Sequence, residues 1–237
     1  RSTLFPYTTL FRSRTGGRGA EQARDLVLAR QLYSSVLTDD NYYSAMAAAR
    51  LDQPVVPHPE KLPVDRTQLR EIGQLPALVR AHELLLSDMR REASNEWQFG
   101  YESLSENARR QSIHLAAEWG WYDQAVATAS QQRIFNDYLL LYPQPFDREV
   151  HAAAKLTQLE PELIYGVLRQ ESLYRADAVS SAGAHGLLQL VPETARRTAQ
   201  RWKRPRPAKE DLFNPTINIS LGAGQLRMPV LDRKSVV

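Results

Sequence analysis

The 237-residue sequence contains no cysteine and no apolar run long enough to cross a bilayer. The first absence excludes disulfide frameworks, cysteine-ligated zinc and a thiol nucleophile. The second excludes a membrane-spanning helix, which needs about 18 or more consecutive apolar residues. Hydrophobic residues make up 43% and charged residues 24% of the chain, which is ordinary for a globular protein. The formal net charge of +3 is too small to indicate a nucleic-acid partner.

Strand patterns are also nearly absent, because alternating stretches rich in Val, Ile and Thr do not occur. Helical spacing of apolar residues recurs instead, and the sequence therefore predicts an all-α fold. Helices are expected over residues 21–37, 42–51, 67–92 with a break near Pro76, 105–118, 121–131, 147–156, 162–174, 192–202 and 216–227.

Proline-rich stretches divide the chain. Residues 53–65 hold four prolines, which stop helices and favour extended backbone, so this stretch is expected to be a loop or linker. A second such stretch, Tyr142–Pro145, follows a series of helical hairpins, and we place a domain boundary there. The expected segments are 1–19 (non-native or disordered), 20–145 (α-helical superhelical or linker region), 146–228 (a second, mostly α domain, truncated) and 229–237 (a non-native tail), so that the native part is a fragment of a longer protein.

One carboxyl has a predicted position of chemical interest. On the helix 162–174, Glu171 is expected on the apolar face, four residues after Val167 and three after Leu168. A carboxyl on an apolar face must be paired, hydrogen-bonded or protonated, and desolvation raises its pKa toward the range that suits a general acid. The alternative is an ordinary surface ion pair with Arg175 at i+4, worth only a few tenths of a kcal/mol.

The residues that follow Glu171 favour the catalytic interpretation. Residues 171–195 read ESLYRADAVSSAGAHGLLQLVPETA, and residues 214–222 read NPTINISLG. In order and spacing these segments resemble the signature of the Slt-type soluble lytic transglycosylases: a glutamate–serine pair, the loop S-x-x-G-A-x-G-L-x-Q, then P-x-T-A and N-P-x-x-N-I-x-x-G. The resemblance covers about residues 146–228. Upstream, NYYSAMAAARL and AAEWGWYDQAVATA look similar to the helical superhelix that precedes this domain in larger family members.

The resemblance implies a lysozyme-like, mostly α domain that acts as a carbon–oxygen lyase on peptidoglycan. In this family one glutamate first protonates the oxygen of the β-1,4 bond between MurNAc and GlcNAc. It then removes a proton from the muramic 6-hydroxyl, which leaves a 1,6-anhydromuramic end without a second catalytic carboxylate. By alignment Glu171 takes this role, and the implied substrate-binding residues are Ser180, Gly183, Gly186 and Gln189. For Ser180 the alternative is an ordinary turn residue, and for Gln189 a structural hydrogen bond to the glycine loop.

Two other functions remain open. A lysozyme-like hydrolase would use water and a second carboxylate, for which Asp177 and Glu193 are the nearest candidates. A helical scaffold would bind cell-wall glycan or protein without turnover. The downstream A-Y-N-x-G element of the family does not appear in this sequence, so we expect this chain to be weakly active or inactive and its longer parent to be active.

No cofactor is expected. The five histidines lie too far apart in the sequence to indicate a metal site, and no phosphate-binding glycine loop follows a predicted strand. The resemblance implies a periplasmic monomer whose partner is the peptidoglycan glycan strand, with peripheral contact to the cell wall or outer membrane and no nucleic acid. The basic stretch 196–209 is either a solvated helix end or a patch that attracts anionic cell-wall strands.

Overall fold

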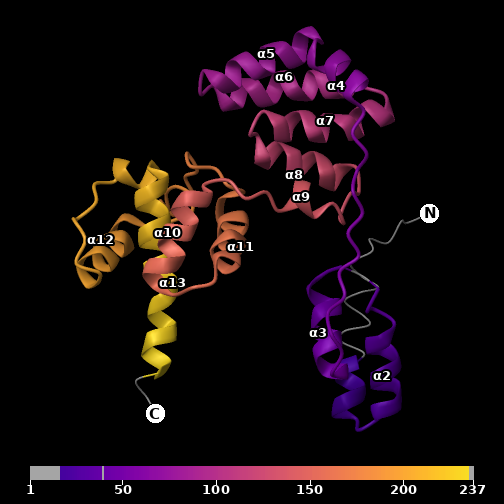
Figure 1. Ribbon diagram of the computed structural model, residues 1–237, viewed down its shortest axis with the longest axis vertical. Coiled ribbons are helices and arrows are strands. Elements are labelled where there is room, and N and C mark those ends of the chain that lie inside the picture. The colour runs from indigo at the N-terminus through magenta and orange to yellow at the C-terminus, as the bar shows by residue number, and fades with distance from the viewer. Residues whose placement is uncertain (1–16, 39, 235–237) are drawn as a thin grey trace. The chain divides into compact units, whose positions relative to one another are not determined.

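The structure is a computed structural model that describes residues 17–38 and 40–234 (Figure 1). Over these residues it contains helices and isolated β-bridges but no strand, so the predicted all-α class is confirmed. None of the described helices combines the length and apolar character needed to cross a bilayer. After the helical residues 17–22, the elements are α2 (Leu26–Ser34), α3 (Tyr42–Leu51), α4 (Arg66–Gly73), α5 (Pro76–Leu86), α6 (Arg90–Glu102), α7 (Glu106–Glu118), α8 (Tyr122–Gln131), α9 (Tyr138–Leu141), α10 (Asp147–Thr157), α11 (Pro161–Ser172), α12 (Pro192–Arg201), the 3-10 helix η1 (Glu210–Phe213) and α13 (Pro215–Lys234).

The chain forms two compact units. The first consists of the residues up to Leu62 together with Ile134–Tyr138, and the second consists of Pro63–Arg133 together with the residues from Leu139 onward. In the first unit α2 and α3 pack as a hairpin around a small apolar core, and Asn41 begins α3 with a reciprocal capping box. The proline-rich stretch after α3 is extended, as expected, and the Leu62 N–H donates to the Asp137 carboxylate at 2.8 Å.

The second unit begins with two helical hairpins. Figure 1 shows α5 and α6 side by side, and α7 beside α8, with α4 packed on α7. Trp97 and Trp121 are buried and meet edge to face at 5.6 Å between ring centroids. A Cβ at Gly100 would lie 2.9 Å from Leu78, so this glycine lets α5 and α6 approach closely.

The sequence reasoning missed α6, α9 and η1. It predicted one continuous helix after Pro76, to about residue 92, but α5 ends at Leu86 and Asp88 adopts a left-handed conformation with φ +57°. The chain reverses there and enters α6. This helix was not apparent because its sequence, RREASNEWQFGYE, is largely polar and has only a narrow buried stripe around Ala93 and Trp97.

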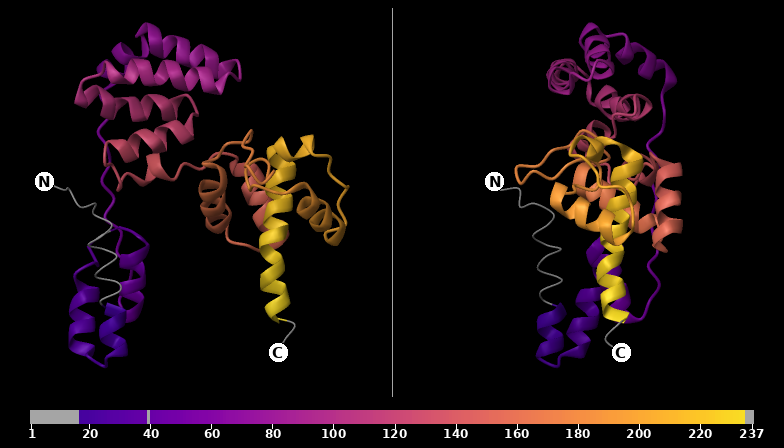
Figure 2. Two further views of the ribbon diagram at one scale, coloured as in Figure 1. Left: turned by 180° about the vertical axis from the view of Figure 1, so that it is seen from behind. Right: turned by 90° about the vertical axis from the view of Figure 1, so that its left-hand side faces the viewer.

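The remaining helices, α10–α13, surround a core that includes Val150, Ile164, Leu168, Leu187 and Ile219. The helix α13 packs against α10, α12 and η1, and its second half projects beyond these helices (Figure 2). Proline occupies the first helical position of α11, α12 and α13, where its missing N–H is not needed.

Both predicted ends of the native sequence include described residues that are helical, and the boundaries of the native part stay predictions. The helix α13 continues to Lys234 and so includes residues 229–234 of the predicted tail. At the other end residues 17–19 are already helical. The rest of the predicted non-native segments, 1–16 and 235–237, lies outside the described residues.

Candidate active site

The helix α11 carries Glu171 near its C-terminal end, but not on the buried face. The buried stripe of α11 runs through Ile164, Leu168 and Ser172, while Leu163 is 50% exposed and Glu171 is exposed. The predicted burial of this carboxyl is therefore wrong for the described residues. The helical spacing fits two neighbouring faces, one through Val167 and Glu171 and the other through Leu168 and Ser172. Packing in the core buries the second face, which is displaced by one residue from the predicted one. Ser172 is accommodated there because its hydroxyl donates to the Leu168 carbonyl.

The Glu171 carboxylate makes no hydrogen bond or ion pair with any described residue, and the alternative surface pair with Arg175 does not form. Arg175 turns to Asp177 instead, with Nη2 3.0 Å from Oδ2 and Nε 3.4 Å from Oδ1. Glu171 is therefore an exposed carboxylate whose oxygens remain available to a ligand.

The turn that follows α11 has an unusual backbone. Leu173 and Tyr174 are both left-handed, with φ values of +48° and +66°, where glycine or asparagine would be usual. Each such residue costs on the order of 1–2 kcal/mol, so tertiary contacts must hold the turn. Tyr174 is buried, and its burial raises the pKa of its hydroxyl to about 12. The turn leads directly from Glu171 into the glycine loop.

The glycine loop, residues 178–190, is held by short-range hydrogen bonds and by bridges of His185 to Val179 and Leu190. The Ser180 hydroxyl accepts the Ala184 N–H at 3.0 Å, and the two residues also pair through their backbones. Ser180 therefore has the structural role in a turn that we considered as the alternative. Its hydroxyl only accepts in this hydrogen bond, so its own proton can still be donated to a ligand. Gly183 has φ +75° and open space on its Cβ side, a position that suits glycine on conformational grounds.

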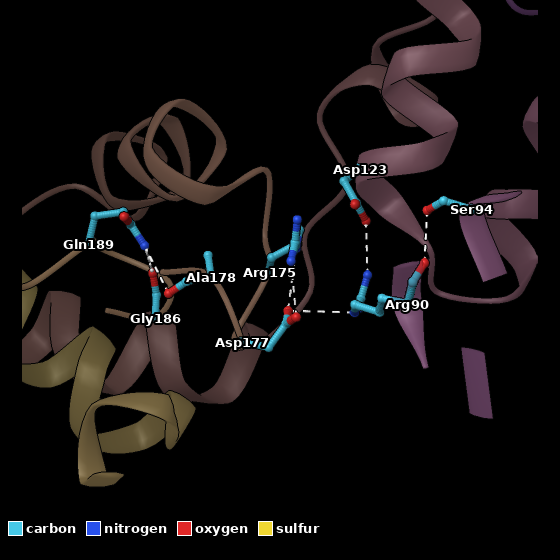
Figure 3. A network of polar contacts seen from close by, with 8 residues as sticks. All are labelled: Arg90, Ser94, Asp123, Arg175, Asp177, Ala178, Gly186 and Gln189. Carbon is cyan, nitrogen blue, oxygen red and sulfur yellow. Dashed lines mark hydrogen bonds and ion pairs between the residues drawn. The ribbon is translucent and has the colours of Figure 1, made fainter. Parts of the chain in front are cut away.

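The Gln189 side chain, like that of Ser180, forms hydrogen bonds within the loop. Its side-chain Nε2 donates to the carbonyls of Gly186, at 2.9 Å, and Ala178, at 3.2 Å (Figure 3). The structural hydrogen bonds considered as the alternative are therefore present. Both amide protons are used within the loop, and no hydrogen bond occupies the side-chain oxygen among the described residues. Ser180, Gly183, Gly186 and Gln189 thus belong to one connected loop, whereas no hydrogen bond links Glu171 to any of them.

Gly186 has a packing role. It is buried, with φ +71°, and a Cβ there would lie 2.1 Å from the Leu212 carbonyl oxygen and 2.5 Å from Asn218 Nδ2. Gly186 is therefore required for packing within the protein, and its implied contact with substrate stays a prediction. No larger residue fits between the loop and the helix behind it.

Asn218, on α13, is the positioning residue whose role sequence reasoning did not identify. It is buried, its Oδ1 accepts the Leu188 N–H at 2.7 Å, and its Nδ2 donates to the carbonyls of His185 and Leu212 at 2.9 and 2.7 Å. One amide thus joins the glycine loop, η1 and α13. Its place in the N-P-x-x-N-I-x-x-G segment was visible, but its partners lie up to 33 residues away in the sequence.

Asn214 and Gly222, in the same segment, also have structural roles. The Asn214 side chain accepts the N–H groups of Thr216 and Ile217 and so caps α13. A Cβ at Gly222 would lie 2.3 Å from Leu188 Cδ1, so this glycine lets α13 pack against the loop. The segment therefore fixes the back of the loop.

Neither candidate for a second carboxylate is placed like a free base. Asp177 lies between Arg175 and Arg90, whose Nε is 3.5 Å from Oδ1. Burial opposes ionisation of Asp177, but the hydrogen bonds from Arg175 and the charges of Arg175 and Arg90 outweigh it and hold the pKa below its ordinary value. Glu193 is an exposed residue of the first turn of α12, 3.7 Å from Arg196.

Two domain models of known proteins match the chain. Residues 149–231 match the transglycosylase SLT domain, and residues 71–138 match the L domain of soluble lytic murein transglycosylases. The chain belongs to the Slt-type lytic transglycosylase family. The L domain as matched contains α5–α8, and the SLT domain contains α11, the glycine loop and α12.

Individual members of the family resemble the chain over most of its length. A putative soluble lytic murein transglycosylase of Haemophilus influenzae is 27% identical over 220 residues, 87% of this chain and 35% of that protein. The crystal structure of an inactive glutamate-to-glutamine mutant of Pseudomonas aeruginosa Slt covers 93% of this chain, with 26% identity, a TM-score of 0.78 and 40% of its own length. The 70-kDa soluble lytic transglycosylase of Escherichia coli has the same fold, with a TM-score of 0.79 at 20% identity over 91% of this chain and 35% of that one. The chain thus spans about a third of the length of the curated relatives it matches.

Proposed function

We propose that this chain is the catalytic part of a lytic transglycosylase that cleaves the β-1,4 bond between MurNAc and GlcNAc in peptidoglycan, with Glu171 as the single acid and base. The observation that carries the proposal is the state of Glu171. It is exposed and forms no ion pair with any residue that the structure describes. A left-handed turn joins it to a hydrogen-bonded loop that presents the Ser180 hydroxyl and the Gln189 side-chain oxygen.

The reaction consists of two proton transfers. The protonated Glu171 carboxyl gives its proton to the glycosidic oxygen while the bond from that oxygen to the MurNAc anomeric carbon breaks. The muramic 6-hydroxyl then attacks the anomeric carbon, and the Glu171 carboxylate accepts its proton, so that a 1,6-anhydro ring closes and no water is consumed. In this proposal the bound glycan covers the exposed carboxyl and excludes water from it.

Two further points support this assignment. The related Pseudomonas aeruginosa enzyme is described as inactive when one glutamate is replaced by glutamine, so that relative depends on a glutamate. A hydrolase would need a second carboxylate that is free to act on water, but the Asp177 carboxylate is held in ion pairs with Arg175 and Arg90.

The partner that follows from this function is the peptidoglycan strand, and the corresponding compartment is the periplasm. The exposed basic side chains at the end of α12 and in the loop after it would attract an anionic strand. They include Arg197, Lys203, Arg204, Arg206 and Lys209.

The test is digestion of purified murein followed by mass spectrometry of the products. The longer parent protein is expected to release anhydro ends, each lighter by one water than a reducing end. Glu171→Gln in that protein should reduce release by about 100- to 10,000-fold, since proton transfer to the leaving oxygen is lost. Glu162→Gln is the matched control, because Glu162 is an exposed carboxylate on the same helix. Reducing ends alone, or undiminished release by Glu171→Gln, would contradict the assignment.

A further inference from the structure

We propose that Arg90 and Tyr122, on two helices of the L domain, are positioning residues for Glu171, because they hold the left-handed turn that follows it. This inference rests on the proposed function of Glu171. According to this inference, the L-domain helices α6 and α8 help to fix the geometry of the active site.

The polar side of this contact is a chain of four charged groups (Figure 3). Arg90 Nη1 lies 3.3 Å from Asp123 Oδ1, and Arg90 Nε lies 3.5 Å from Asp177 Oδ1. Arg175 pairs with the same Asp177 from the other side. Arg90 is on α6 and Asp123 on α8, so one guanidinium joins both helices to the segment after α11. Arg90 and Asp123 are 30% and 23% exposed, which reduces screening of their attraction by solvent.

The apolar side of the contact is a tyrosine pair. The ring of Tyr122, at the start of α8, meets that of Tyr174 edge to face, with centroids 6.1 Å apart. Tyr122 also packs against the core of the SLT domain. Tyr174 is the second of the two left-handed residues, so this contact acts on the strained part of the turn.

The turn needs such support because neither left-handed residue is glycine. Without Tyr122 and Arg90 the backbone at Leu173 and Tyr174 would relax toward its preferred region. Relaxation would displace the end of α11, where Glu171 lies. It would also displace Ala178, whose carbonyl accepts both the Gly186 N–H at 2.8 Å and the Gln189 side chain. The contact therefore fixes the carboxyl and the glycine loop together.

The first test is kinetic and compares Arg90→Gln with Arg80→Gln in the longer parent protein. Arg80 forms an ion pair with Glu96 at 2.7 Å, which joins α5 to α6 and touches neither the turn nor α8, so it is a matched control on the same hairpin. We expect Arg90→Gln to lower kcat about tenfold with KM changed less than about twofold, because misplaced catalytic groups slow the chemical step. Arg80→Gln should leave both constants unchanged. Arg90→Lys, which can satisfy one acid at a time, should recover part of kcat.

A second test uses amide hydrogen exchange, which reports on the turn whether or not the chain is active. Arg90→Gln and Tyr122→Ala should speed exchange at the Tyr174 and Gly186 amides by about tenfold or more, but not within α13. Addition of Arg90→Gln to Asp177→Asn should lower kcat no further, since the pair is already broken.

The outcomes separate this inference from the proposed function. A longer parent protein that yields no anhydro product refutes the function, while the exchange rates still decide whether α6 and α8 hold the turn. Unchanged exchange at Tyr174 and Gly186 overturns the inference. So does a loss of activity confined to KM, or one that appears equally in Arg80→Gln.

Discussion

Replacement of Asn218 by aspartate tests the view that one buried amide holds the glycine loop. The change keeps the shape of the side chain and the acceptor for the Leu188 N–H, but turns the donor that serves the His185 and Leu212 carbonyls into an acceptor. Two buried hydrogen bonds are lost, and each unsatisfied group costs about 1–3 kcal/mol. We therefore expect the free energy of unfolding to fall by about 3–5 kcal/mol at pH 7, a large part of the stability of an ordinary domain.

The variant should also become sensitive to pH. A buried aspartate facing two carbonyl oxygens has its pKa raised above the unfolded value near 4, because the protonated form restores one donor. A raised pKa in the folded state stabilises the fold below the unfolded pKa, and this contribution is lost as the pH rises through the folded pKa. The difference in unfolding free energy between wild type and Asn218→Asp should therefore widen from about pH 4 to pH 7.

The measurement is denaturant unfolding at several pH values, with Asn214→Asp as the matched control. Asn214 lies in the same segment, but its side-chain oxygen only accepts N–H groups at the start of α13, which an aspartate does equally well. Asn214→Asp should therefore be neutral or slightly stabilising. Equal stabilities of the two variants at pH 7 would refute the assigned role of Asn218.

Two other predictions concern the loop and the turn. Gly186→Ala should lower the free energy of unfolding by about 2–4 kcal/mol, because its Cβ meets the Leu212 carbonyl. Gly183→Ala should lower it by only about 1 kcal/mol, because only the left-handed backbone opposes a side chain there. Equal melting temperatures of the two variants would contradict this difference. Burial raises the pKa of Tyr174 to about 12, so its contribution is complete below pH 10 and is lost between about pH 10 and 12. The free energy of unfolding of Tyr174→Phe should therefore fall less than that of wild type between about pH 10 and 12, as measured by denaturant unfolding.

Local signals in the sequence were sufficient to place most helix boundaries. Proline at the first helical position marked the starts of α11, α12 and α13, and Asn41 marked the start of α3. The helix α6 was missed because the break before it depends on the left-handed Asp88, for which the residue type gave no strong signal. Capping is a property of a few neighbouring residues, and it can therefore be predicted without knowledge of the fold.

The environment of the candidate site could not be predicted in the same way. The apolar face assigned to α11 was displaced by one residue, since Val167 and Leu168 are equally suited to a core and only the packing partners decide between them. The partners of Asn218 come from the loop and from η1. Such contacts join distant parts of the chain, and no spacing rule within one helix contains them.

The residues of the signature therefore fall into two groups with different physical requirements. Gly186, Gln189, Asn218 and Gly222 make contacts within the protein that shape the loop, whereas the Glu171 side chain forms no hydrogen bond or ion pair with residues 17–38 and 40–234. Changes in the first group should lower stability, and activity should fall with it. Glu171→Gln removes only a charge from an exposed side chain, so stability should stay within about 0.5 kcal/mol of wild type while activity is lost. A substantial loss of stability in Glu171→Gln would show that this carboxylate also has a structural role, and the separation of the two groups would fail.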